Sequence, residues 1–460
     1  MVDIFIKNAS WIATLQNDRK IIRNGSIAIE DGIIASVTKT TDLGGNYQNA
    51  EFIVDGTNKL VIPGLVDGHV HCVQQLGKGL ADDTNVFDML YERLFPLEAS
   101  LTEKEAYFSS LLSQLEMIKS GTTCFFDPGS YHPEQVVKAL EKSGLRALVA
   151  RCARDIPLSE NDKLSNENAE QAYKRGEEFV RQFTGTLGGR VRGSFSLRLL
   201  YDCSDELCRK TAELAAKYNT IIQTHADADK KSVETSVRRH GASGLERIKK
   251  LGMLGVPILM IHMGGIPNSA LPMMRDSNLK GVSCPVAAAH SGGSTSPYLP
   301  EMLDLGIQVC FGSDSAGNNN CLDVTRAMNF AALSTKRDRS DATILKPEQL
   351  LEMATLNAAK IASWDSELGS IEVGKKADIS IFNTARPEWV PVNNPIASLV
   401  YSGTGSSADT VIVDGRLLML NRKVVTLDEE ALVEEAFQRG TELASRLGLD
   451  KKAGSSWPMV

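Results

Sequence analysis

Eight short apolar runs, separated by stretches with helical periodicity, restrict the fold of this chain more than any other feature of its sequence. They span residues 64–71, 121–129, 146–152, 191–198, 221–226, 256–263, 280–287 and 308–315. Between them lie helical patterns such as 102–120, where Leu and Met recur on one face. This alternation predicts an α/β fold with a (β/α)8 TIM-like barrel, whose reactive groups lie at the carboxyl ends of the strands. An open doubly wound sheet is the alternative, but no Gly-rich dinucleotide fingerprint follows an early strand.

Both ends of the chain differ from this central pattern. Residues 3–60 contain short strand-like runs with an Asp31-Gly32 hairpin signal. Similar strand-like runs follow Gly369, with Asp414-Gly415 at a turn. The two ends therefore predict one small β-sandwich domain. We expect three parts: a composite β-sandwich of residues 1–60 and 364–427, a barrel of 61–363, and a charged amphipathic helix with a tail over 428–460.

Charge and hydropathy exclude several classes of partner. The chain has 50 Lys and Arg against 57 Asp and Glu, a net charge of -7, which argues against nucleic acid. No apolar run approaches the roughly 20 residues of a membrane span. The N-terminus lacks a secretory pattern, so we expect a cytoplasmic protein whose eight cysteines are reduced core residues. A small-molecule substrate is the expected partner, and the C-terminal helix suggests a homo-oligomer.

Five of the seven histidines fall at the ends of the predicted barrel strands. His69 and His71 are separated by one residue, so strand periodicity directs both imidazoles to one face. His225 ends the fifth strand and Asp314 ends the eighth. Any one of these could be a hydrogen-bonded core residue, but their convergence predicts a metal site with room for water. His132 and His240 are assigned no role.

Several motifs make the chain resemble the metal-dependent amidohydrolase superfamily, in its deaminase and chlorohydrolase branch. They are Val61-Ile-Pro-Gly-Leu-Val-Asp-Gly-His-Val-His, Lys119-Ser-Gly-Thr-Thr, Gly312-Ser-Asp, Ala354-Thr-Leu-Asn-Ala-Ala-Lys and Gly369-Ser-Ile-Glu-Val-Gly-Lys-Lys-Ala-Asp. The resemblance covers essentially the whole chain. It implies the metal ligands His69, His71, His225 and Asp314, with His262 near the attacking water. The fourth strand lacks the Lys that bridges two metals in part of the superfamily, so one divalent ion per chain is expected: zinc first, with cobalt, iron or nickel as alternatives.

The chain also departs from that branch at three places. Ala228 stands where the branch usually has a proton-shuttling Glu, and the flanking Asp227 and Asp229 are expected to point elsewhere unless the loop rearranges. Arg198 replaces a His after the fourth strand, and its alternative role is an ion pair with an acid such as Asp202. His290 lies in the segment that usually carries an amide and an ammonium group, and its alternative is a loop or capping role. With these changes, the chain resembles molinate hydrolase and the phenylurea hydrolases.

The expected function is hydrolysis of a C–N or C–S bond in a urea, carbamate or thiocarbamate by metal-activated water. Asp314 takes a proton from the water, Arg198 and His290 contact the substrate and its developing oxyanion, and His262 or His290 protonates the leaving group. The alternative is an aminohydrolase or chlorohydrolase of a triazine, purine or pterin, with Asp227 or Asp229 replacing the Glu. A non-catalytic binding protein is a third hypothesis. Apolar residues within 87–97 suit an aromatic or alkyl substrate, or a helix that only covers the barrel.

Overall fold

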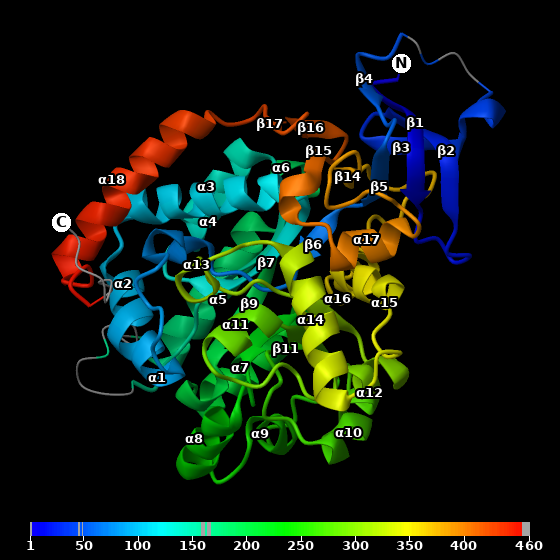
Figure 1. The fold of residues 1–460 in the computed structure, drawn as a ribbon. Coiled ribbons are helices and arrows are strands. Elements are labelled where there is room, and N and C mark those ends of the chain that lie inside the picture. The colour runs from blue at the N-terminus through cyan, green and yellow to red at the C-terminus, as the bar shows by residue number, and fades with distance from the viewer. Residues whose placement is uncertain (1, 45–46, 48, 158–161, 163–166, 453–460) are drawn as a thin grey trace.

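A parallel eight-stranded barrel forms the centre of the molecule (Figure 1). The structure is a computed structural model that describes residues 2–44, 47, 49–157, 162 and 167–452. Its strands follow chain order around the sheet, and each falls within one of the eight predicted apolar runs or overlaps it: β6 (Leu65–Asp67), β7 (Thr122–Ser130), β8 (Arg146–Arg151), β9 (Val191–Leu199), β10 (Ile222–His225), β11 (Ile258–Ile261), β12 (Leu279–Ser283) and β13 (Val309–Phe311). The predicted TIM-like barrel is confirmed.

The barrel closes between its first and last strands by a few backbone contacts. The Gly68 amide donates to the Phe311 carbonyl at 2.7 Å, and the Asp314 amide donates to the His69 carbonyl at 2.8 Å. A Cβ atom at Gly68 would lie 2.3 Å from Cys310 Sγ, so only glycine permits this approach. The seam therefore places His69 beside Asp314.

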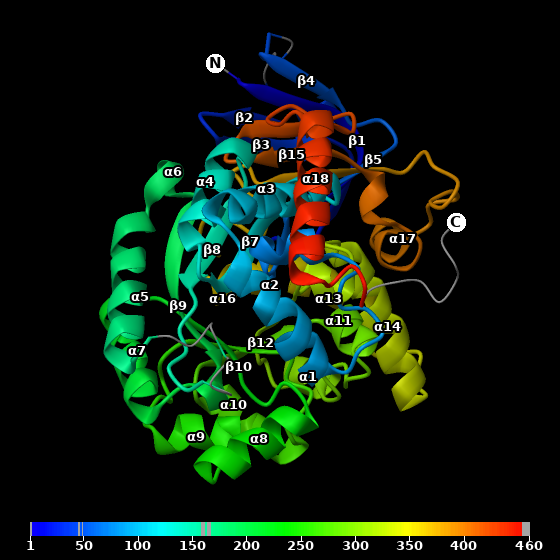
Figure 2. The same ribbon diagram turned by 90° about the vertical axis from the view of Figure 1, so that its left-hand side faces the viewer.

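Helices surround the barrel, as the two views show (Figures 1 and 2). The predicted helix over 102–120 is observed as α3, whose Thr102 side chain forms a capping box with Glu105. The longer covering helices are α3 (Glu103–Lys119), α4 (Pro133–Ser143), α5 (Ala169–Phe183), α7 (Asp205–Lys217), α8 (Lys230–His240), α9 (Gly244–Lys250) and α14 (Val324–Arg339). Shorter ones are α6 (Thr186–Gly189), α10 (Leu271–Asp276), α11 (Pro285–His290), α12 (Leu299–Asp304), α13 (Ala316–Asn319), α15 (Pro347–Glu352), α16 (Ala358–Ile361) and α17 (Pro395–Tyr401).

A second sheet combines strands from both ends of the chain, as predicted. Its order is β17 (Lys423–Val424), β16 (Arg416–Leu420), β15 (Ala408–Val413), β14 (Ile379–Asn383), β5 (Lys59–Pro63), β1 (Ile4–Ala13), β2 (Ile21–Glu30) and β3 (Ile33–Lys39), with β4 (Phe52–Asp55) beside β1. Both hairpin signals are confirmed, because Asp31-Gly32 joins β2 to β3 and Asp414-Gly415 joins β15 to β16, with positive φ at all four residues. The domain boundaries themselves stay a prediction.

The C-terminal helix α18 (Glu429–Leu447) packs along α3 (Figure 2). Glu429 pairs with Lys119 at 2.9 Å, and Arg446 pairs with Glu105 at 2.9 Å, so each end of α18 is tied to one end of α3. Among the described residues, no helix combines the length and the apolar character that crossing a bilayer requires. All eight cysteines are free thiols, and seven of them are buried.

Candidate active site

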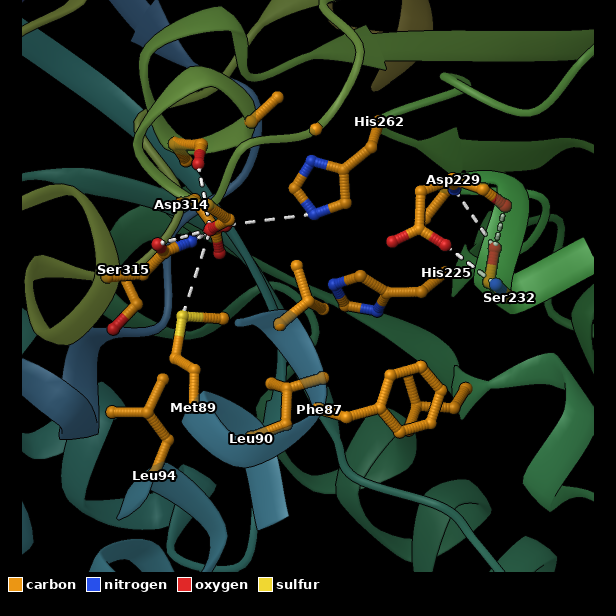
Figure 3. Close-up of a pocket in the computed structure, with 18 of the residues that line it drawn as sticks. Phe87, Met89, Leu90, Leu94, His225, Asp229, Ser232, His262, Asp314 and Ser315 are labelled. Carbon is orange, nitrogen blue, oxygen red and sulfur yellow. Dashed lines mark hydrogen bonds and ion pairs between the residues drawn. The ribbon is translucent and has the colours of Figure 1, made fainter. Parts of the chain in front are cut away.

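Four histidines and one aspartate meet at the carboxyl end of the barrel. The Asp314 carboxylate lies 3.3 Å from His69 Nε2, 3.7 Å from His71 Nε2 and 3.7 Å from His262 Nε2. The ring of His225 is 5.0 Å from that of His69, centroid to centroid. Figure 3 shows His225, His262 and Asp314 converging on one cavity. The structure thus brings together every residue that the sequence predicts as a metal ligand, and His262 with them.

Backbone conformation explains how the strand ends present these side chains. His69 and His71 lie just past the end of β6, and Val70 between them forms a parallel bridge with Asp314. Asp314 has φ of 66° and His262 has φ of 71°. The left-handed region is unfavourable for residues other than glycine, and such conformations concentrate at functional sites because the surrounding structure holds them. Both residues hold this conformation where their side chains meet, with His262 Nε2 3.7 Å from the Asp314 carboxylate.

Burial sets the protonation of the cluster. It lowers the pKa of His71 and of His225 well below the usual range, and that of His262 to a lesser extent, so these rings are neutral at pH 7. Burial alone would raise the pKa of Asp314, but the contacts with His69, His262 and His225 together outweigh it and hold the pKa below its usual range. His225 Nδ1 lies 2.6 Å from the Arg198 carbonyl and donates to it, which leaves the Nε2 lone pair free.

The donor set fits a divalent metal. His69, His71 and His225 place their ligand atoms within 4.8 Å of one another, as do His69, His262 and Asp314. Neither ring nitrogen of His69, although both are buried, has a hydrogen-bond partner in the described part of the chain. A buried nitrogen without a partner is destabilising unless something else uses its lone pair. Neutral imidazoles with one ionised carboxylate are ligands that zinc, cobalt, iron and nickel accept.

A cavity of about 890 Å³, its open mouth included, adjoins the cluster. One wall is apolar and comes from α1 (Val86–Asp88), the π-helical segment η3 (Met89–Leu94), α2 (Phe95–Ser100) and the end of β9. Phe87, Met89, Leu90 and Leu94 lie there, facing the histidines (Figure 3). The predicted apolar segment 87–97 therefore contributes side chains to the cavity and also covers the barrel.

The two aspartates beside Ala228 have different surroundings. Asp227 accepts hydrogen bonds from the Gly244 and Leu245 amides at 2.7 and 2.8 Å, and so caps helix α9. Asp229 lines the cavity: one of its carboxylate oxygens accepts from the Ser232 amide, and the other is turned toward His225 and His262 (Figure 3). Asp229 thus meets the exception that the sequence analysis allowed, because the backbone departs from a regular strand at Asp227, which has φ of 51°.

Arg198 lines the cavity but is held by a partner that the sequence did not indicate. Its guanidinium donates to both carboxylate oxygens of Glu98, at 3.0 and 3.3 Å, and to the Gly129 carbonyl at 2.6 Å. Glu98 and Arg198 are only 1% and 4% exposed. Asp202, the suggested partner, pairs instead with Arg154 at 2.8 Å. Arg198 as an oxyanion donor stays a prediction.

His290 lies apart from the cluster. It ends α11, its side chain is 32% exposed, and Nε2 is 3.7 Å from Asp82. Its neighbours Ala287, Ala288 and Ser291 line the cavity, and His290 is not among the lining residues. A substrate contact from His290 therefore stays a prediction that the observed side-chain position does not favour.

Three polar residues of the site escaped the sequence analysis. Gln74 and Glu98 hydrogen-bond to each other at 2.9 Å next to Arg198. Asn318 donates to Asp314 Oδ2 at 2.9 Å and accepts from Ser291 at 3.0 Å, which orients the carboxylate. The only signals were positional, because Gln74 follows His71 by three residues and Asn318 follows Asp314 by four.

Replacing Glu98 with alanine is expected to lower the free energy of unfolding by about 3–5 kcal/mol, because it leaves the buried Arg198 charge without a partner. Urea denaturation followed by circular dichroism measures the change. Glu92→Ala, at an exposed glutamate of η3, serves as the control and should change the stability by less than about 0.5 kcal/mol. Equal stabilities of the two variants would contradict the importance of this ion pair.

Comparison with known proteins identifies the family and the fold. The family described as "Amidohydrolase family" matches residues 60–418. A 5-methylthioadenosine/S-adenosylhomocysteine deaminase of Thermoanaerobacter pseudethanolicus is 31% identical over 97% of this chain and 100% of its own length. A 5'-deoxyadenosine deaminase of Methanosarcina acetivorans is 32% identical over 97% and 99%. The crystal structure of a zinc-bound adenosine deaminase from Xanthomonas campestris superposes with a TM-score of 0.90 at 23% identity, over 96% of this chain and 99% of that one.

The match to the family spans more than half of the chain, and the named relatives cover nearly all of it. The converging histidines and Asp314 lie at the carboxyl ends of the barrel strands, where TIM-barrel enzymes carry their active sites. This chain therefore belongs to the amidohydrolase family and is a hydrolase that acts on carbon–nitrogen bonds.

Proposed function

We propose that the protein is an aminohydrolase that replaces the amino group of a neutral nitrogen heterocycle, of the adenosine type, with oxygen and releases ammonia. The position of Asp229 carries this proposal. Its free carboxylate oxygen faces His225 and His262 inside the cavity, so an acid is present although the neighbouring position is Ala228. Two relatives that are 31% and 32% identical over nearly their whole length are named as deaminases of adenosine derivatives, which supports this reaction over cleavage of a urea or carbamate.

His69, His71, His225 and Asp314 would hold one divalent ion, with zinc as the first candidate. When bound, the ion would lower the pKa of water toward about 7, which makes water a nucleophile at neutral pH. His225 is already oriented for this role, because its Nδ1 is committed to the Arg198 carbonyl. Asp314 is held in place by Asn318 through Oδ2.

Asp314, His262 and Asp229 bind the water or transfer its protons. The ionised Asp314 accepts a proton from the attacking water, and His262, 3.7 Å from Asp314 Oδ2, contacts the same water. Water adds to the ring carbon that carries the amino group. The proton held by Asp314 passes to the adjacent ring nitrogen. Asp229 takes the second proton of the former water, from the hydroxyl of the adduct, and delivers it to the leaving nitrogen, so that the carbonyl forms, the carbon–nitrogen bond breaks and ammonia departs. The apolar wall around Leu90 and Leu94 keeps bulk water from the reacting atoms.

The test is a product assay on metal-reconstituted protein. The panel contains 5'-deoxyadenosine, 5'-methylthioadenosine, an amino-triazine, an aryl urea and a thiocarbamate, and mass spectrometry identifies the products. We expect ammonia from an adenosine derivative, with a gain of one mass unit in the heterocycle. Release of an amine or a thiol from the last two compounds, without ammonia from the first three, would contradict the proposal.

One observation favours a second candidate, hydrolysis of a urea, carbamate or thiocarbamate. Ala228 occupies the position of the acid that aminohydrolases of this branch use, and it lines the cavity. Attack on such a carbonyl needs an oxyanion donor more than a proton shuttle. Arg198 also lines the cavity, and it would be the candidate donor. The same assay separates the two functions by their released products.

A further inference from the structure

We propose that Glu98 is a positioning residue for the metal site: its ion pair with Arg198 holds a backbone bulge whose carbonyl orients the imidazole of His225. Glu98 belongs to α2 and is not among the residues that line the cavity. The inference rests on the proposed function only in that it takes His225 as a metal ligand. It does not depend on which bond the enzyme cleaves.

Arg198 occupies a bulge in the barrel sheet. Along the pair formed by β9 and β10, Thr224 is opposite Leu197, but the next residue, His225, is opposite Leu199. Arg198 is therefore left over between two successive pairs. An extra residue of this kind bends its strand and re-aims the neighbouring groups, and such bulges are frequent beside active sites.

The carbonyl of this extra residue is the group that His225 contacts. His225 Nδ1 donates to it at 2.6 Å, and Thr224 Oγ1 donates to the Leu197 carbonyl, also at 2.6 Å. A hydrogen bond from one ring nitrogen fixes the tautomer and the orientation of an imidazole, which leaves the other nitrogen for a metal. The direction of the Arg198 carbonyl thus sets the direction of His225 Nε2.

The rest of Arg198 is fixed by contacts with other segments. Its guanidinium donates to Glu98 at 3.0 and 3.3 Å, and to the Gly129 carbonyl near the end of β7 at 2.6 Å. Its backbone amide donates to the Ala153 carbonyl, just past β8, at 3.1 Å. A bulged residue is left unpaired in the ladder of its sheet, so contacts such as these determine where its backbone lies.

Glu98 is the charged partner among these contacts. Glu98 and Arg198 are 1% and 4% exposed, so bulk water does not compensate either charge. Without the carboxylate, a buried cation would lose its counterion, which is strongly unfavourable unless the guanidinium moves. Among the described residues, the other carboxylates that line the cavity are Asp229 and Asp314. A guanidinium attracted to them would shift the Arg198 backbone and bring a positive charge to the metal site, and both changes oppose the binding of a cation.

A second buried ion pair has similar contacts but no connection to the site. Arg146 begins β8, and its guanidinium donates to both carboxylate oxygens of Asp378, at 2.8 and 3.1 Å. The two side chains are 2% and 5% exposed. Arg146 lies at the amino end of its strand, whereas the histidine cluster lies at the carboxyl ends of the strands. Asp378→Asn is therefore the matched control for Glu98→Gln, because each substitution removes one carboxylate charge from a buried pair and keeps the size of the side chain.

The experiment measures metal affinity separately from catalysis. Metal-free protein is titrated with Co²⁺ in competition with a chelator, and the visible absorption spectrum of the cobalt-loaded protein reports the geometry of the ligands. We expect Glu98→Gln to weaken Co²⁺ binding by about 10- to 100-fold and to alter the spectrum, because groups that orient metal ligands have effects of this size. Asp378→Asn should lower the Tm and leave both the affinity and the spectrum unchanged.

A double variant keeps the test decisive if Glu98→Gln does not fold. Glu98→Leu combined with Arg198→Met replaces the ion pair with apolar side chains of similar size, which proteins often tolerate. Because this variant removes the side-chain anchor of the bulge, it should also bind Co²⁺ at least about 10-fold more weakly than the unsubstituted protein.

Unchanged affinity and spectrum in Glu98→Gln, or in the double variant, would overturn the positioning role. An equal loss of affinity in Asp378→Asn would overturn it as well, because the loss would then follow stability alone. Failure of the unsubstituted protein to bind Co²⁺ overturns both the metal site and the role of Glu98. Binding that depends on Glu98, without ammonia release from any heterocycle, supports the role of Glu98 and overturns the proposed function.

Discussion

Replacing His69 with alanine is expected to remove bound metal and hydrolytic activity together. His69 is fully buried, neither of its ring nitrogens has a hydrogen-bond partner within the described residues, and its Nε2 is 3.3 Å from the Asp314 carboxylate, so it lies at the centre of the donor set. Metal-derived stabilisation of a transition state amounts to several kcal/mol, so the rate should fall by at least about a thousandfold. Metal content per chain, measured by plasma emission spectrometry, and the rate of ammonia release are the two readouts.

His132→Ala is the control for this experiment. His132 precedes α4, and its Nε2 lies 3.0 Å from the Leu101 carbonyl, outside the histidine cluster. This variant should keep the metal and the rate. Full retention of metal in His69→Ala would show that the ion binds elsewhere, and two ions per chain in the unsubstituted active protein would contradict the expectation of a single metal.

The substitution Asp229→Asn is expected to lower kcat by about 10²- to 10⁴-fold, the usual contribution of general acid–base catalysis, while metal content stays unchanged. Asparagine keeps an oxygen that can accept from the Ser232 amide, so the N-terminus of α8 remains capped. The variant therefore removes the proton-carrying group and retains the fold. Single-turnover measurements with 5'-deoxyadenosine report the loss directly.

Asp227→Asn is the matched control for Asp229→Asn. Asp227 lies two residues before Asp229 in the chain, but both of its carboxylate oxygens accept hydrogen bonds from the first amides of α9. This variant should reduce stability by about 1 kcal/mol and leave the turnover of the folded protein unchanged. An Asp229→Asn protein with unaltered kcat would exclude Asp229 from proton transfer. The carbonyl hydrolysis described above, which needs no such acid, would then become the better hypothesis.

The barrel was predictable from the sequence because its signal is local. Strands buried on both faces appear as continuous apolar runs, such as residues 147–150, and the helices between them show their own period. The composite sheet was predictable for the same reason, since Asp31-Gly32 and Asp414-Gly415 specify tight turns. Neither signal indicated how the first and last strands meet, because the Gly68 and Phe311 contact depends on how the whole barrel closes.

The metal-ligand candidates were predictable for a related reason, whereas the residues around them were not. His69, His71, His225 and Asp314 stand at or just past the ends of strands, and the carboxyl ends of parallel strands share one face of a barrel. Glu98 lies 100 residues before Arg198 in the chain, and nothing in either neighbourhood identifies the other as its partner. Strand periodicity likewise could not give the direction of Asp229, because the backbone departs from a regular strand at Asp227.

The sequence by itself therefore determined which helices and strands form and which side chains lie at the ends of the strands, because these features depend on residues that are close together in the chain. Tertiary structure decided which distant groups pair with them. The ion pair of Arg198 with Glu98 and the orientation of the Gln74 amide both depend on contacts between segments that lie far apart in the chain. Hydrogen bonds and ion pairs act over a few ångströms, so their partners are defined by the folded geometry and not by spacing along the chain.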